Sequence, residues 1–273
     1  MLLCLNSEWQ GSGVPDLERG ARELARDLFG SRPYLDLGPS GFQSLDSRDG
    51  VYALDSVVER FGIASRELEC VEPERIVTVG GTCGSEAAPV AYLACRYPGL
   101  GIVWLDAHGD LNTPATSRSG HFHGMVLRTL LGQGPAGFAD RIACPLEPDR
   151  VVVAGVRDLD PPEREYAVAS GLALIEGWPP DVIARISESL RSAGVSRLYV
   201  HVDVDVFDPE DYGDALFSVP GGPSLREVAQ AVRSLVDSFD VAGVGVVESR
   251  GREPEARRKL VAFMNDSGLL PVI

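Results

Sequence analysis

The chain has 273 residues, of which 44% are hydrophobic and 24% charged, and its formal net charge is −15. This composition is that of an ordinary globular protein and excludes a disordered or collagen-like chain. The acidic balance argues against nucleic acid and against an anionic membrane surface as partners. The chain has no apolar run near the roughly 20 residues that a membrane span needs, and its first residues do not resemble a secretion signal.

The cysteines indicate a cellular compartment. Five of them are scattered along the chain without a CxxC pair: Cys4, Cys70, Cys83, Cys95 and Cys144. An odd, unpatterned set is more typical of a reducing compartment than of a disulfide framework. We therefore expect free thiols and a cytoplasmic location.

Hydrophobic spacing predicts helices and strands in alternation. Two stretches with helical spacing come first, at 17–29 and 54–61. Apolar strands then alternate with crossover helices, with strands at 75–79, 101–105, 150–154, 198–202 and 241–247 and helices at 86–96, 123–131, 180–193 and 225–237. Almost continuously apolar strands suit a parallel sheet buried on both faces. We expect one α/β domain over residues 1–273, with ligands outside the carboxyl ends of the strands.

Two acidic motifs follow two of these strands. The motif WLDAHGDLN at 104–112 places Asp106, His108 and Asp110 at alternate positions, which share one side of an extended backbone. The motif HVDVDVFDP at 201–209 places Asp203 and Asp205 on a common face by the same rule. Burying this many carboxylates at one sheet edge is costly unless cations compensate them.

The type of donor indicates the type of metal. Carboxylates outnumber imidazoles, which favours a hard divalent ion such as Mn²⁺ over a thiolate-rich zinc site. There are enough shared oxygens for two ions about 3.5–4 Å apart, a spacing at which a bridging water becomes nucleophilic. Either cluster alone could be a solvated strand end with cap residues. The presence of both in one chain favours the dimetal interpretation.

The ordered motifs resemble those of the ureohydrolases, the family of arginases and agmatinases. Besides the two acidic motifs, the resemblance rests on GGTC at 80–83, SGHFHGM at 119–125 and the Val-Glu pair at 247–248. It implies a three-layer α/β/α sandwich with a mostly parallel central sheet, and a dimanganese centre that hydrolyses guanidinium groups. It also implies metal ligands: Asp106 and Asp203 bridging both ions, Cys83 and Asp110 completing one site, and His108 and Asp205 completing the other.

The resemblance also implies catalytic roles for three side chains. Asp205 would pass a proton to the departing amine, and His123 would shuttle protons near it. Glu248 would anchor the guanidinium group. Read without the family, His123 could be a buried histidine at a helix start, and Glu248 could be a surface glutamate.

A substrate with an α-amino-acid end is implied by further positions. The loop at 155–163 resembles the version found in arginases rather than the one found in agmatinases. In the arginase version, an aspartate receives the α-ammonium group of the substrate. Asp160 fits that role and Asp158 lies beside it, although both could simply cap the next helix. Asn112, Ser119 and His121 match positions near the amino-acid head, with His121 in place of the usual polar amide.

The main departure from the family is Cys83, which stands where a histidine ligand is expected. A thiol is a poor match for Mn²⁺, so the first metal could be weakly held, or absent if Cys83 is only a buried small residue. Phe217 and Ser218 also replace a Thr-Pro pair near the substrate. The chain ends soon after Glu248, whereas arginases carry a longer tail there that is used in trimer contacts. This comparison leaves the oligomeric state open, and a short tail is compatible with a monomer.

An arginase-like chain with cysteine at this position closely resembles the Nω-hydroxy-L-arginine hydrolases of antibiotic biosynthesis. Those enzymes release L-ornithine and hydroxyurea. We therefore expect hydrolysis of Nω-hydroxy-L-arginine. Alternatives among enzymes are an ordinary arginase, an agmatinase-like hydrolase, or a one-metal amidohydrolase of the related deacetylase architecture. From a different class, a catalytically silent amino-acid-binding protein is the alternative, although it would be expected to lack Asp205 or His123.

Overall fold

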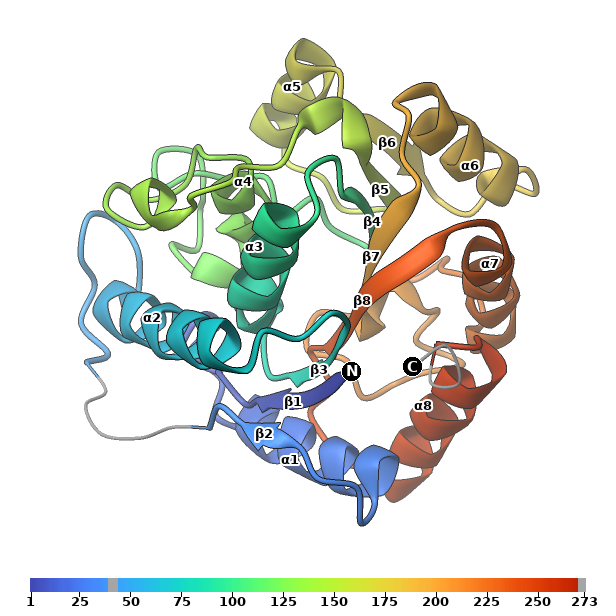
Figure 1. Ribbon diagram of the computed structural model, residues 1–273, viewed down its shortest axis with the longest axis horizontal. Coiled ribbons are helices and arrows are strands. Elements are labelled where there is room, and N and C mark those ends of the chain that lie inside the picture. Colours follow the sequence, from blue (N-terminus) through green and yellow to red (C-terminus); the bar gives the residue numbers. More distant parts are fainter. Residues whose placement is uncertain (39–43, 270–273) are drawn as a thin grey trace.

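The protein is built around a single eight-stranded sheet (Figure 1). The computed structural model describes residues 1–38 and 44–269. The strand order is β2-β1-β3-β8-β7-β4-β5-β6, and neighbouring strands are paired in parallel. The strands are β1 (Leu2–Asn6), β2 (Leu35–Asp36), β3 (Ile76–Gly80), β4 (Gly101–Leu105), β5 (Val151–Val156), β6 (Ala173–Glu176), β7 (Arg197–Asp203) and β8 (Asp240–Val247).

Helices cover both faces of the sheet (Figure 1). One face packs against α1 (Asp16–Phe29), α6 (Val182–Ser192), α7 (Leu225–Ser238) and α8 (Pro254–Asp266). The other packs against α2 (Leu54–Val71), α3 (Ala87–Arg96), α4 (Val126–Leu130) and α5 (Pro161–Ser170). Alternate residues of each strand enter the two cores, as Val103 and Leu105 do on one side and Ile102 and Trp104 on the other. The predicted three-layer α/β/α fold is confirmed, with a fully parallel sheet.

The predicted elements are present, and the unpredicted ones are short or atypical. The five predicted strands correspond to β3, β4, β5, β7 and β8. Strands β2 and β6 were not predicted because they have only two and four residues, and the five-residue β1 was missed although four of its residues are apolar. Helices α5 and α8 begin with proline and are rich in charge, so their apolar faces are weakly marked. Helix α2 continues ten residues past the predicted end at 61.

The cysteine expectation is wrong in one respect. Cys95, in the last turn of α3, forms a disulfide with Cys144 in the loop before β5, and their Cα atoms are 5.2 Å apart. The pair is separated by 49 residues, and such a pairing cannot be deduced from sequence spacing alone. Within the described residues, none of the helices combines the length and apolar character needed to span a bilayer.

Candidate active site

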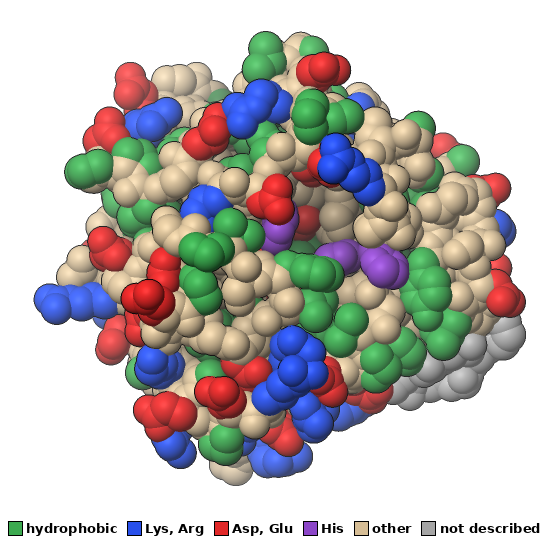
Figure 2. Space-filling view, turned by 180° about the vertical axis from the view of Figure 1, so that it is seen from behind, with side chains coloured by type: hydrophobic (Ala, Val, Ile, Leu, Met, Phe, Trp, Pro, Cys, Tyr) green, Lys and Arg blue, Asp and Glu red, His purple; other side chains and the backbone are tan. Residues whose placement is uncertain are grey.

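A cavity of about 250 Å³ lies at the carboxyl edge of the sheet. Parallel strands bring the loops that follow them to one edge, where ligands of this fold class bind. Figure 2 shows the hollow, with acidic and histidine side chains around it. Its walls include most of the predicted residues: Cys83, His108, Asp110, Asn112, Ser119, His123, Asp158, Asp160, Asp203, Asp205 and Glu248.

The loop after β4 positions Asp106 and His108. Asp106 is 1% exposed; its Oδ1 accepts the His108 amide at 2.7 Å, and its Oδ2 accepts Trp104 Nε1–H at 3.2 Å. The ring of His108 turns toward Asp205, with Nδ1 2.9 Å from Asp205 Oδ2. These contacts fix both side chains at the base of the cavity.

The end of β7 positions Asp203 and Asp205. Asp203 is the last residue of the strand, and Asp205 lies in the 3₁₀ turn Val204–Val206, where its amide donates to Asp203 Oδ1 at 2.8 Å. The amide of Ala107 donates to Asp205 Oδ1 at 3.0 Å, linking this turn to the loop after β4. Both residues are at least 97% buried.

The structure corrects the reason why these side chains converge. Strand β4 ends at Leu105 and Asp110 has φ +52°, so 106–110 is not extended backbone. Asp203 and Asp205 likewise meet through a 3₁₀ turn rather than through strand alternation. The predicted residues do lie together, but tight local turns bring them there.

The ends of β3 and β8 bring Cys83 and Glu248 together. The Cys83 thiol donates to Asp203 Oδ2 at 3.1 Å, and its amide donates to Glu248 Oε1 at 3.2 Å. Glu248 is 2% exposed with φ +67°, a strained conformation of the kind that clusters at functional sites. His123 Nδ1 lies 3.3 Å from the same Glu248 oxygen, so Glu248 is not a surface glutamate.

The charges of this cluster are unbalanced. Burial raises the pKa of Asp110 and of Asp203 well above the ordinary value, and neighbouring carboxylates add to the rise. Burial, followed by the charge of Asp106, raises the pKa of Asp205 to about 6. Burial lowers the pKa of His108, but hydrogen bonds to Asp106 and Asp205 outweigh it and raise the pKa to about 12. The protein by itself therefore supplies too little positive charge for these carboxylates.

The donor set fits divalent cations. Possible ligand atoms lie within 4.8 Å of one another in three groups: Cys83, Asp106, Asp110 and His201; Cys83, Asp203 and Glu248; and Asp106, His108 and Asp205. Within the described residues, the buried atoms Asp110 Oδ2, His201 Nε2 and Glu248 Oε2 have no hydrogen-bond partner. Carboxylates with some imidazole suit Mn²⁺. Burial raises the pKa of the Cys83 thiol well above its ordinary value, and this sulfur is the donor that suits Mn²⁺ least.

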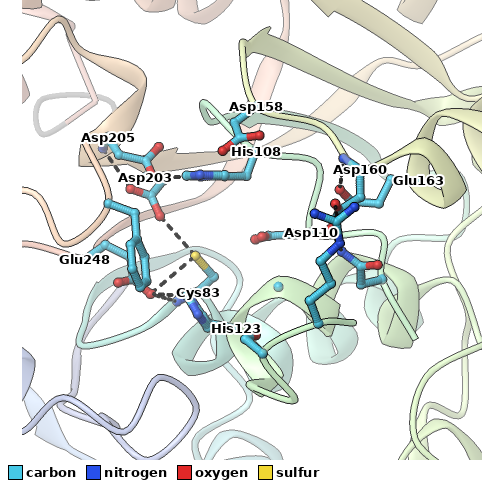
Figure 3. Close-up of a pocket in the computed structure, with 15 residues that line it drawn as sticks. Cys83, His108, Asp110, His123, Asp158, Asp160, Glu163, Asp203, Asp205 and Glu248 are labelled. Carbon is cyan, nitrogen blue, oxygen red and sulfur yellow. Dashed lines mark hydrogen bonds and ion pairs between the residues drawn. The ribbon is translucent and has the colours of Figure 1, made fainter. Parts of the chain in front are cut away.

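The wall away from the acidic cluster carries the predicted substrate contacts (Figure 3). Asp160, the N-cap residue of α5, accepts a hydrogen bond from Asn112 Nδ2 at 3.2 Å. Asp158 and Ser119 also line the cavity. Asp160 thus begins a helix and faces the cavity, so the capping and binding interpretations are compatible.

His121 is the predicted substrate contact that the cavity does not include. Its ring packs edge-on against Tyr52, with 5.3 Å between centroids, and lies 6.1 Å from the ring of His123. The backbone at His121 is extended just before the 3₁₀ turn Phe122–Met125, which sends alternate side chains in different directions. The predicted contact of His121 with substrate therefore has no support in the position of its ring.

Several site residues were not predicted. Glu163 accepts the amides of Leu111 and Asp160 at 2.9 and 3.0 Å and so joins the loop after β4 to the start of α5. The Asp-x-x-Glu spacing of a capping box could have indicated it. Arg157 donates to the carbonyl oxygens of Asp205 and Val206 at 2.8 and 3.1 Å, which holds the turn after β7.

Two further residues line the cavity, and only Arg118 was not predicted. Phe217, expected near the substrate, stacks on the ring of His123 with 5.5 Å between centroids. Arg118 has a side chain that is 83% exposed, with Nε 3.7 Å from Asp160 Oδ1. Both come from loops whose course no hydrophobic pattern predicts.

Comparisons with known proteins show the family of this chain. A model of the Arginase family matches residues 27–255. The arginase of Staphylococcus aureus strain MRSA252 is 31% identical over 215 residues, which is 76% of this chain and 70% of that protein. The arginase of Bacillus subtilis strain 168 is 32% identical over 193 residues, 68% of this chain and 65% of that protein.

A solved structure extends the similarity to the whole fold. The arginase of Entamoeba histolytica, in complex with L-ornithine, superposes with a TM-score of 0.85 at 20% identity and covers 97% of each chain. At that identity the superposition shows the fold, while the family model and the curated relatives show the ancestry. The chain therefore belongs to the arginase family, hydrolases that act on the carbon–nitrogen bonds of amidino groups.

Proposed function

We propose that this protein hydrolyses the guanidino group of an α-amino acid, with L-arginine as the first candidate and L-ornithine and urea as products. One observation carries the proposal: a single cavity has the acidic cluster on one wall and Asp160 with Asn112 on another. The sequence alone favoured Nω-hydroxy-L-arginine. The relatives named arginase favour the alternative, L-arginine, and the Entamoeba histolytica structure holds L-ornithine.

The acidic cluster would hold two Mn²⁺ ions. Asp106 and Asp203 would be shared, Cys83 and Asp110 would complete one site, and His108 and Asp205 would complete the other. Such a pair of ions supplies a nucleophilic water at neutral pH. The grouping of Asp106 with Asp110 and with His108 and Asp205 supports this assignment, whereas Asp203 is grouped only with Cys83 and Glu248, and the Cys83 sulfur is the donor that suits Mn²⁺ least.

Other side chains would bind the substrate and move protons. The buried Glu248 carboxylate has one oxygen without a partner in the described residues, and it would accept hydrogen bonds from the guanidinium group. Asp205 would transfer a proton to Nδ of the departing ornithine. The His123 side chain is 15% exposed, so it can exchange protons with solvent next to Glu248.

Steady-state assays with excess Mn²⁺ on L-arginine, Nω-hydroxy-L-arginine and agmatine test the proposal. We expect both amino acids to yield ornithine. The kcat/KM for agmatine should be lower than that for L-arginine by about 10-fold or more, because agmatine lacks the carboxylate and a charged hydrogen bond is worth about 1.5–3 kcal/mol. Failure to hydrolyse either amino acid would contradict the proposal and favour a silent binding protein. Metal analysis separates the one-metal alternative, since we expect two ions per chain.

Nω-hydroxy-L-arginine remains the second candidate because of Cys83. A smaller and weaker ligand there would change how the substrate hydroxyl meets the first metal, whereas in ordinary arginases this compound is an inhibitor. Cys83→His should lower the ratio of hydroxyarginine to arginine turnover. Cys70→Ser, at an exposed cysteine of α2, is the control and should leave the ratio unchanged. An unchanged ratio in Cys83→His would exclude this role for the thiol.

A further inference from the structure

The family resemblance places an imidazole at position 83, and in this chain a different imidazole, on β7, lies next to Cys83. We propose that His201 of β7 is a nitrogen ligand of the cation held by Cys83, Asp106 and Asp110. The inference rests on the proposed dimetal site and deepens it. It assigns a role to a histidine that the sequence motif contains and that the family pattern leaves without one.

His201 is placed to reach this cation. It precedes Asp203 by two residues on β7, so both side chains point to the same face of the strand. Its Nε2 lies 3.9 Å from Asp106 Oδ2, and one ligand atom each of Cys83, Asp106, Asp110 and His201 lie within 4.8 Å of one another. Metal–ligand bonds of about 2.0–2.4 Å allow ligand atoms this far apart around one ion.

The hydrogen bonding of the ring leaves the facing nitrogen available. His201 is fully buried, and its Nδ1 lies 3.0 Å from Glu86 Oε2. An ionised Glu86 only accepts, which places a proton on Nδ1, and in the neutral ring Nε2 then carries the lone pair. Among the described residues Nε2 has no hydrogen-bond partner, although buried polar atoms are almost always paired. A carboxylate behind an imidazole is the usual arrangement around metal-bound histidines.

The surroundings are shaped to hold this arrangement. A Cβ at Gly245 of β8 would lie 1.7 Å from Glu86 Oε1, so the strand leaves room for the glutamate only because this residue is glycine. The Trp104 ring stacks on the His201 ring with 3.5 Å between centroids and 8° between planes. Trp104 Nε1 also donates to Asp106 Oδ2 at 3.2 Å. One tryptophan thus orients the imidazole and the shared carboxylate together.

Pulsed electron paramagnetic resonance on His108→Ala tests the proposal without changing His201. This substitution removes the other imidazole of the acidic cluster, so a remaining Mn²⁺ ion can be coupled to ¹⁴N of a directly bound imidazole only through another histidine. We expect that coupling in His108→Ala and its loss in His108→Ala/His201→Asn. A bound ion without ¹⁴N coupling, or coupling that persists in the double variant, overturns the proposal; if His108→Ala holds no ion, the Mn²⁺ titrations of the otherwise unchanged protein decide.

Binding titrations with Mn²⁺ supply a second readout. His201→Asn should weaken one of the two ions by about 10–100-fold or more, and Cys83→His in that background should restore much of the affinity. Cys70→Ser changes an exposed residue of α2, away from the acidic cluster, and should bind Mn²⁺ as the wild type does. Equal affinities in His201→Asn and wild type contradict the proposal.

The outcomes separate this inference from the proposed function. If the wild type binds no Mn²⁺ and hydrolyses neither amino acid, both fail. If the wild type binds two ions and turns over substrate while the ¹⁴N coupling is absent and His201→Asn binds normally, only the role of His201 fails.

Discussion

The two halves of the acidic cluster differ in how completely the protein itself satisfies them. In the His108 half, made of Asp106, His108 and Asp205, each carboxylate oxygen accepts a hydrogen bond from an N–H group or forms an ion pair with the His108 ring. In the Cys83 half, made of Cys83, Asp110 and His201, two buried atoms have no partner within the described residues, Asp110 Oδ2 and His201 Nε2.

This difference indicates what each half requires. The His108 half is held in place by backbone amides of the loop after β4 and the turn after β7, so its geometry exists before a cation binds. The Cys83 half contains buried polar atoms that form no hydrogen bond within the described residues, so only a bound cation would give them a partner. Leaving such atoms unpaired lowers the stability of the fold. We therefore expect mutations in the His108 half to damage both structure and activity, and mutations in the Cys83 half to act mainly through metal binding.

The largest expected effect is on activity, in the His108 half. Asp205→Ala and His108→Ala each remove a proposed metal ligand, and Asp205 is also the proposed proton donor. We expect kcat/KM for guanidino hydrolysis to fall by about 10³-fold or more, which corresponds to about 4 kcal/mol of transition-state stabilisation. Steady-state assays at saturating Mn²⁺ measure this. Full activity in either variant would remove the dimetal proposal.

A smaller loss is expected where the cluster meets solvent. His123 contacts Glu248 and Phe217 but belongs to neither half, so His123→Ala should leave both ions bound. Loss of a proton-transfer group costs about 10²–10⁴-fold in kcat, and we expect the lower end because solvent can reach the site. Partial recovery of kcat with added imidazole would support the role; loss of an ion from the variant would place His123 among the ligands instead.

The sequence predicted the residues of the His108 half better than those of the Cys83 half. Asp106, His108 and Asp205 follow apolar strands, and a parallel sheet must bring those strand ends to one edge. Their exact approach depends on turns that alternation does not describe, as at Asp110. His201 carries no such signal, because a histidine within an apolar strand is predicted to be an ordinary core residue. Its neighbours Glu86 and Gly245, which indicate otherwise, come from other parts of the chain. The Cys95–Cys144 pairing likewise depends on tertiary contacts alone.

The cavity wall with Asp160 offers a comparison that leaves the metal cluster intact. Asp160→Asn removes the proposed partner of the α-ammonium group, so kcat/KM for L-arginine should fall by about 10–100-fold, the worth of a charged hydrogen bond. Turnover of 4-guanidinobutyrate, which has no α-amino group, is the internal control and should change little. Equal losses for both compounds would indicate that Asp160 acts by capping α5 instead.

The smallest expected effects are on stability without metal, and they contrast the two halves directly. In metal-free protein Asp106→Asn disturbs the hydrogen bonds from Trp104 and the His108 amide to a carboxylate whose pKa burial would raise but contacts with His108 lower, and it should lower the free energy of unfolding by about 1–3 kcal/mol. Asp110→Asn changes a carboxylate with an unpaired, buried oxygen and should be nearly neutral or slightly stabilising. Denaturant unfolding after chelation measures both. Equal destabilisation by the two variants would show that the Cys83 half is as well satisfied by the protein as the His108 half.

Adding Mn²⁺ should reverse the ranking of Asp110→Asn relative to wild type. Free metal at about 100 times its Kd stabilises a folded protein by about 2.7 kcal/mol per site, which for a chain of this size raises Tm by roughly 5–10 °C. The wild type should gain from two sites, whereas Asp110→Asn should gain from little more than one, because the ion of the Cys83 half has lost a charged ligand. A variant that is as stable as wild type without metal but less stable with it would show that Asp110 is retained for the cation and not for the fold.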